Sequence, residues 1–147
     1  MPSINVNIQP GGPIIGILVG VSNPRFAALT AAGQTPPAPV LGSFLIDTGA
    51  SGTAVDPNLI VSLGIQPTGI AAIRTPSTQG GVHHCSQYDV SLFIPDNTGA
   101  SGHFIPALPI ITPQLRTQGI DGLLGRDVLN NCVLIYNGTR SLITLSY

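Results

Sequence analysis

Short apolar segments separated by glycine and proline form the dominant pattern along the chain. Residues 4–8 alternate apolar and polar side chains, which predicts a half-buried or edge strand, and Pro10-Gly11-Gly12-Pro13 ends it. Further segments of strand length occupy residues 14–21, 40–47, 71–75, 88–94 and 103–111. The pattern therefore predicts an all-β chain of short strands connected by tight turns.

Two hairpins are indicated by their turn residues. Residues 133–145 contain Asn137-Gly138 between two apolar segments, the strongest local turn signal in the chain. Residues 71–75 and 88–94 flank a polar stretch that ends in Gly80-Gly81, and paired glycines permit the positive φ that a hairpin tip needs. We expect the tip of this second hairpin at residues 77–81.

Helix signals are few. Asp56 as N-cap, Pro57 at the first helical position and Gly64 at the end predict a short helix of about two turns. Residues 22–39 carry Gly33 and several prolines, and we expect no regular structure there beyond a short turn at residues 26–31. That stretch is interpreted as an insertion between two strands.

Composition limits the function classes. The 147 residues fit one domain, 1–147, and only 7 % of them are charged, with a formal net charge of −1, so no basic surface favours nucleic acid. The longest apolar segment, residues 14–21, contains two glycines and is far shorter than the ~20 residues of a membrane span. The first residues lack a basic region followed by an apolar one, so the expected location is cytoplasmic. Cys85 and Cys132 match no CxxC motif; buried thiols are expected, with a disulfide as the alternative.

One carboxylate stands out from this pattern. Asp47 directly follows the apolar segment Phe44-Leu45-Ile46 and precedes Thr48-Gly49. A buried strand that ends on Asp and turns at once holds the carboxylate at the rim of a core, within reach of the turn's N–H groups. Taken alone, Asp-Thr-Gly also fits an ordinary turn, because Asp and Gly are common turn residues.

A second motif makes the resemblance specific. Leu45-Ile46-Asp47-Thr48-Gly49-Ala50-Ser51 is similar to the active-site loop of aspartic proteases, and Asp121-Gly122-Leu123-Leu124-Gly125-Arg126-Asp127 is similar to the element that follows the substrate loop in retropepsins, the retroviral-type family. The resemblance covers the chain from about residue 14 to the final hairpin. It implies an acid-protease-like closed β-barrel half with a flap hairpin and one or two short helices, active as a symmetric dimer.

The implied activity is that of an aspartic endopeptidase. A water molecule is activated between the two Asp47 carboxyls of a homodimer and attacks an extended protein or peptide substrate, with no cofactor and no metal. The resemblance assigns the catalytic loop to Asp47, Thr48 and Gly49. A homodimer follows because no other acid of this chain lies in such a motif, and the terminal strands 4–8 and 141–147 are expected to pair across chains.

Substrate contacts are expected beside Asp47 and in the flap hairpin. They are Ala50, Thr78, Gln79, Gly80, Gly81, Ile120 and Leu123. The apolar members of this set are equally interpretable as core, and core is the better interpretation for Leu124. Arg126 is expected to anchor the turn that carries Asp47. Retroviral members often have an acid where this chain has Ser51, so Arg126 needs another partner: backbone carbonyls, Asp127 or an acid elsewhere.

Other functions fit the sequence less well. A catalytically silent retropepsin-fold module, used for dimerisation or peptide binding, is the main alternative. His83-His84-Cys85 with Asp89 is not expected to bind a metal, because adjacent residues of a strand point to opposite faces. Neither Ser43 nor Ser51 lies in a complete Gly-x-Ser-x-Gly hydrolase motif.

Overall fold

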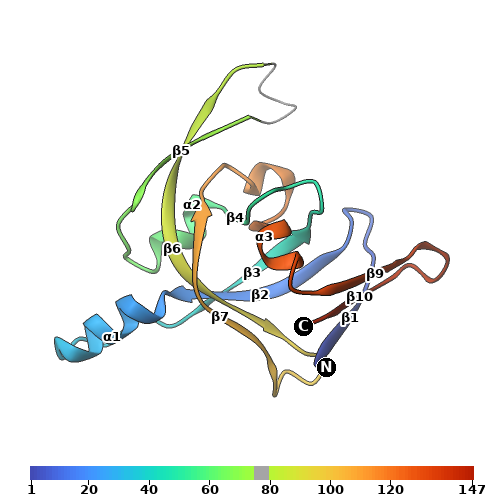
Figure 1. The fold of residues 1–147 in the computed structure, drawn as a ribbon, viewed down its shortest axis with the longest axis horizontal. Coiled ribbons are helices and arrows are strands. Elements are labelled where there is room, and N and C mark those ends of the chain that lie inside the picture. Colours follow the sequence, from blue (N-terminus) through green and yellow to red (C-terminus); the bar gives the residue numbers. More distant parts are fainter. Residues whose placement is uncertain (75–79) are drawn as a thin grey trace.

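A closed barrel of six strands forms the body of the molecule in the computed structural model, which describes residues 1–74 and 80–147 (Figure 1). The ring closes because β2 pairs with β3 on one side and with β6 on the other. β5 (Gly69–Ile73) adds to the outside of β6. The strands of the ring, in spatial order, are β2 (Ile14–Val21), β3 (Val40–Ile46), β8 (Gly122–Leu124), β4 (Ala54–Val55), β7 (Gly102–Ile111) and β6 (His83–Pro95). The expectation of an all-β, acid-protease-like closed barrel is confirmed.

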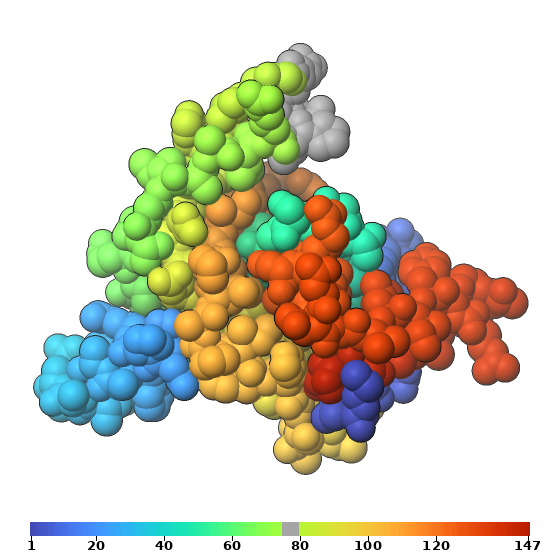
Figure 2. Space-filling model, in the orientation of Figure 1, coloured from blue at the N-terminus to red at the C-terminus, as the bar shows by residue number. Residues whose placement is uncertain are grey.

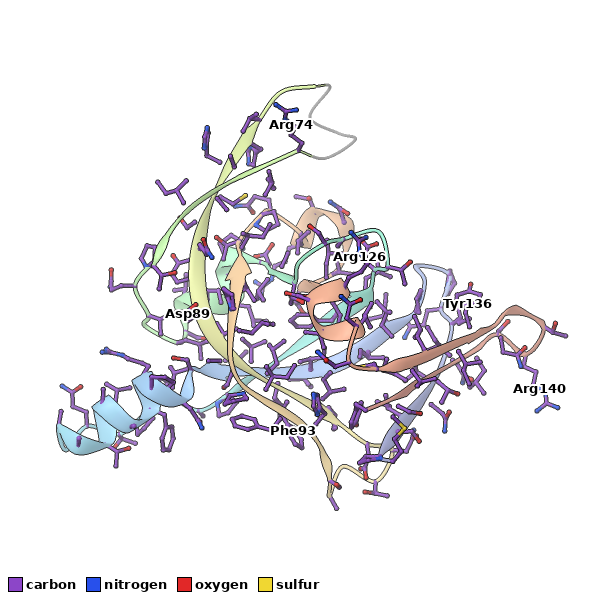
Figure 3. The ribbon with its side chains drawn as sticks, in the orientation of Figure 1. Arg74, Asp89, Phe93, Arg126, Tyr136 and Arg140 are labelled. Carbon is purple, nitrogen blue, oxygen red and sulfur yellow. The ribbon has the colours of Figure 1, made fainter. Side chains whose placement is uncertain are left out.

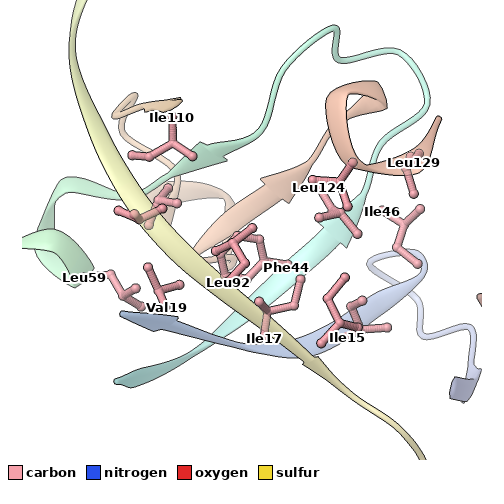
Figure 4. Packing of buried hydrophobic residues seen from close by; sticks show 14 of the residues in the cluster. Ile15, Ile17, Val19, Phe44, Ile46, Leu59, Leu92, Ile110, Leu124 and Leu129 are labelled. Atoms are coloured by element: carbon pink, nitrogen blue, oxygen red, sulfur yellow. The ribbon is translucent and has the colours of Figure 1, made fainter. Parts of the chain in front are cut away.

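The barrel is filled by side chains from all of its longer strands. Phe44, Leu92 and Leu124 are fully buried; Phe44 and Leu92 lie side by side at its centre, and Leu124 lies toward Ile46 and Leu129 (Figure 4). Leu124 is thus a core residue, as the sequence favoured. Gly122 has no side chain because the ring of Phe44 fills that space: a Cβ built there lies 2.2 Å from the Phe44 Cε1 atom. This close packing fixes β8 against β3, and β3 is the strand that carries Asp47.

A second, three-stranded sheet contains both ends of the chain. Its order is β1 (Ser3–Asn7), β10 (Leu142–Ser146) and β9 (Val133–Asn137). β10 is hydrogen bonded along both edges within one chain. The expectation that the C-terminal strand pairs across chains is therefore wrong for β10, because its backbone groups are already used. The outer edges of this sheet are β1 and β9.

Two of the three α-helices follow the sequence signals. α2 (Pro57–Val61) begins as expected, with the Asp56 carboxylate accepting a hydrogen bond from the N–H of Asn58 at 2.9 Å. α3 (Arg126–Leu129) is the short helix of the second retropepsin-like motif. α1 (Asn23–Ala31) corrects the expectation of a mere turn at residues 26–31. Proline near its start and alanines through its body favour the helix, whereas the helix-breaking prolines lie after its end.

The two hairpins are present with altered details. β9 and β10 are joined by a 3₁₀ turn (Gly138–Arg140) with Ser141 in the left-handed region at φ 48°, so Asn137-Gly138 begins the connection and does not form a two-residue tip. β5 and β6 form the expected flap hairpin, which rises from the barrel in Figures 1 and 2. Part of its expected tip, including Thr78 and Gln79, lies outside the described residues. A second 3₁₀ turn spans Arg116–Gln118.

No helix among the described residues has the length and apolar character needed to cross a membrane.

Candidate active site

Asp47 lies at the end of β3, where the chain leaves the barrel and turns. Its backbone N–H donates to the carbonyl of Leu124 at 3.0 Å, which ties the start of the turn to β8. Its carboxylate atom Oδ1 accepts from the N–H of Gly49 at 2.8 Å and of Ala50 at 3.3 Å. Within the described residues Oδ2 has no hydrogen-bond partner. The turn therefore fixes the carboxylate through one oxygen and makes no hydrogen bond to the other.

The loop around Asp47 is held from below by the β8–α3 segment. β3 and β8 run parallel and pair Leu45 with Leu123. At the end of β8, Gly125 approaches the loop so closely that a Cβ there lies 2.4 Å from the carbonyl carbon of Gly52. Only glycine permits this contact between two backbones. The second sequence motif thus serves to support the first.

Arg126 completes this support. Its Nη1 donates to the carbonyl oxygens of Thr48, at 2.8 Å, and of Gly49, at 3.1 Å, and its backbone N–H donates to the carbonyl of Ala50 (Figure 3). Of the partners left open by the sequence, backbone carbonyls are the ones found. Because these contacts are made to the main chain, the guanidinium fixes the loop without an acid at the position of Ser51.

Thr53 and Asp127 form a second link, which sequence reasoning did not identify. The Asp127 carboxylate accepts from the Thr53 hydroxyl at 2.7 Å and from the Thr53 N–H at 2.9 Å. The same hydroxyl accepts from the N–H of Gly125 at 3.1 Å, and Thr53 is only 1 % exposed. The end of the Asp47 loop is thereby fixed to the first turn of α3. The signal available in the sequence was a Thr shortly after the loop and an Asp next to Arg126.

A third anchor is the buried side chain of Asp56. Its long-range partners were not identified from the sequence. Beside its cap on Asn58, its Oδ2 accepts from the N–H groups of Leu115 and Arg116, both at 2.8 Å. Burial alone raises the pKa of this carboxyl, but the hydrogen bonds from Arg116, Asn58 and Leu115 outweigh it and lower the pKa to about 2. Asp56 also donates its N–H to the carbonyl of Asp121 at 2.7 Å. It thus holds the segment that leads from β7 to β8.

The expected substrate-binding residues occupy different environments. Ala50 and Leu123 are half-buried, and Gly80 and Gly81 are exposed on the flap. Ile120 is 6 % exposed and packs with Ala54 and Leu115 in a small apolar cluster, so the core interpretation that was left open fits it better in the single chain. Two shallow hollows on the described surface lie beside α1 and near Asp89, and neither is lined by Asp47.

The other candidate groups do not assemble a site. The described residues contain no cluster of three His, Cys, Asp or Glu side chains placed to hold a metal ion. His83 and His84 are exposed on β6 opposite β5. Cys85 and Cys132 are free thiols, and burial raises the pKa of both.

Comparison with known proteins agrees with this geometry. No curated protein matches the sequence. Among solved structures, the fold is similar to that of a retropepsin-like aspartic protease from Rickettsia conorii, with a TM-score of 0.60 and 18 % identity over 99 % of this chain and 90 % of that one. A family model described as aspartyl protease matches residues 30–128, which include the whole Asp47 loop and the Gly125-Arg126-Asp127 element that supports it. The chain therefore belongs to the aspartyl protease family and has the retropepsin-like fold.

Proposed function

We propose that the protein is an aspartic endopeptidase that works as a homodimer, with one Asp47 from each chain. The observation that carries the proposal is the Asp47 loop itself. One carboxylate oxygen is bound by the turn, the other has no partner within the described residues, and two side-chain anchors, Arg126 and the Thr53–Asp127 pair, hold the loop in place. The membership in the aspartyl protease family supports the same chemistry.

The reaction needs two carboxyl groups in different protonation states. One takes a proton from the attacking water while the other presents a proton to the scissile carbonyl. Two carboxyls about 3 Å apart cannot both ionise, so the pair shares one proton, which is the established behaviour of aspartic proteases as a class. A two-fold axis through the Asp47 loops places the two groups together. Thr48, which is exposed at the turn, then hydrogen bonds across the axis and locks the loops to each other.

The substrate is an extended peptide held between the loop and the flap. We expect Ala50 and Leu123 to line its apolar side, with Ile120 in the apolar cluster against which Leu123 packs, and Gly80 and Gly81 to cover it from the flap. Thr78 and Gln79, which lie outside the described residues, remain expected substrate contacts. Glycines in the flap let the substrate backbone approach closely.

Asp47→Asn tests the proposal, because the change is nearly isosteric and removes both ionisable groups of the dimer at once. The purified variant is expected to keep its circular dichroism spectrum and to lose all cleavage of a mixed peptide library at mildly acidic pH. Wild-type cleavage is expected to stop with a hydroxyl-type transition-state mimic. An Asp47→Asn variant with wild-type turnover contradicts the mechanism. Wild-type protein that binds peptides without cutting them establishes the silent module instead.

A further inference from the structure

β9 (Val133–Asn137) is an exposed apolar edge strand that is separate from the Asp47 loop and its anchors. Its only backbone hydrogen-bond partner within the described residues is β10. Val133, Ile135 and Tyr136 are 49 %, 55 % and 61 % exposed. Folded proteins usually protect such an edge with charge, proline or a bulge, and β9 contains neither charge nor proline. Figures 2 and 3 show this hairpin at the margin of the molecule, with Tyr136 and Arg140 labelled in Figure 3.

The opposite edge of the same sheet is closed within the chain. The side chain of Asn97 accepts from the N–H of Asn5 at 2.7 Å and donates to the Asn5 carbonyl at 2.9 Å. Asn5 is the middle residue of β1. The turn that presents Asn97 is itself fixed, since Asp96 accepts from both the N–H and the hydroxyl of Thr98. One edge of the sheet thus carries its own cap, whereas β9 is left open.

The direction of the free backbone groups follows from the ladder. The N–H of Ile8 donates to the carbonyl of Ser141, so the even-numbered residues of β1 face β10. Successive residues of β10 direct their backbone groups alternately to β1 and to β9. The backbone N–H and C=O groups of Val133, Ile135 and Asn137 therefore point toward β10. The N–H and C=O groups of Leu134 and Tyr136 point out from the sheet.

We infer that β9 pairs antiparallel with β9 of a second copy, about a two-fold axis at Ile135. Leu134 then exchanges hydrogen bonds with the partner subunit's Tyr136, and the two Ile135 side chains lie opposite each other. This joins the two small sheets into one continuous sheet. An antiparallel pair of identical strands is self-complementary, as an isologous interface requires, and the uncharged strand meets no repulsion.

The partner of β9 is a second copy of this chain, because the Asp47 site is incomplete without one. On this point the inference rests on the proposed function. The strand is also close in sequence to the helix that holds the Asp47 loop. β9 begins just after α3, and Arg126 of α3 holds the Asp47 loop through its carbonyls (Figure 1). One short helix thus connects the paired strand to the residue that holds the Asp47 loop.

Ile135→Lys tests the pairing, because it sets two ammonium groups opposite each other at an otherwise exposed position. Sedimentation equilibrium is expected to show at least about a 100-fold rise in the dimer dissociation constant. Val61→Lys is the matched control: Val61 is 77 % exposed on α2, and the wild-type dissociation constant is expected. Mixing Ile135→Lys with Ile135→Glu is expected to restore a dimer, which a merely misfolded variant does not do.

Amide exchange in the wild-type protein gives an independent readout that needs no variant. The amides of Leu134 and Tyr136 are expected to exchange slowly where the dimer is populated and quickly after dilution to monomer. A monomer at all concentrations, a dimer that Ile135→Lys leaves intact, or fast exchange at these two amides in the dimer overturns the inference. A dimer that pairs through β9 but cuts no peptide supports the pairing and refutes the proposed function. A dimer that cleaves peptides and is not weakened by Ile135→Lys supports the proposed function and refutes the pairing.

Discussion

Asp56→Asn is expected to destabilise the fold strongly, although Asp56 makes no hydrogen bond to the Asp47 loop among the described residues. The carboxylate accepts from the N–H and side-chain amide of Asn58 through Oδ1, and from the N–H groups of Leu115 and Arg116 through Oδ2. An asparagine keeps one oxygen, so the cap on α2 survives. Its NH₂ group then faces two further N–H donors in a site that is closed to solvent.

The size of the effect can be bracketed in two ways. Lowering the pKa from 3.8 to about 2 corresponds to about 2 kcal/mol of preference for the charged over the protonated form. Hydrogen bonds to a charged group contribute about 1.5–3 kcal/mol each, and two are lost. A protonated acid can still rotate its proton away from a donor, whereas an amide cannot. We therefore expect a loss of about 3 kcal/mol or more at pH 7.

Urea unfolding followed by circular dichroism measures this loss, at one protein concentration because dimers gain stability with concentration. With an m-value of about 1–3 kcal/mol per M, the midpoint falls by about 1 M or more. The folded pKa lies below the unfolded one, so the carboxylate stabilises the protein above about pH 4, and this contribution disappears as pH falls to about 2. The gap between wild type and Asp56→Asn is thus expected to narrow by about 2 kcal/mol over that range.

Asp96→Asn serves as the control, since Asp96 also accepts turn hydrogen bonds but lies in the distant β6–β7 connection. A smaller loss is expected there. The reasoning is refuted if Asp56→Asn unfolds within about 0.5 kcal/mol of wild type, the usual range of harmless surface changes. It is equally refuted if the gap stays constant between pH 5 and pH 2.

Two further substitutions test the loop and the flap. Arg126→Gln is expected to lower kcat/KM by about tenfold or more while the fold persists, because the carbonyls of Thr48 and Gly49 lose a charged donor; unchanged peptide kinetics would exclude this role. Replacing Gly80-Gly81 by Ala-Ala is expected to lower kcat/KM several-fold, since Gly80 has φ +81° and the flap must move. Gly99→Ala, at φ +71° in a remote turn, introduces the same strain and should leave kcat/KM unchanged; an equal drop would point to stability alone.

Local patterns determined much of the fold. Strand segments, the capped start of α2 and the two retropepsin-like motifs were readable because each depends on residues adjacent in sequence. The sequence pattern did not predict α1, because the helix-breaking prolines and glycine of residues 32–39 follow closely on its alanines. The partner of Arg126 was left open for a related reason: backbone carbonyls carry no sequence signature.

The sequence by itself determined which loop carries the candidate catalytic carboxylate, Asp47, and which segment supports that loop. Tertiary structure alone decided how that support works, because Thr53 meets Asp127 and Asp56 meets Leu115 only after the barrel closes. It also decided which edge of the terminal sheet stays open. An alternating apolar pattern specifies that a segment is a strand, but the same pattern is shared by central and edge strands. β10 became central and β9 an edge through the pairing of the two chain ends, which no local signal encodes.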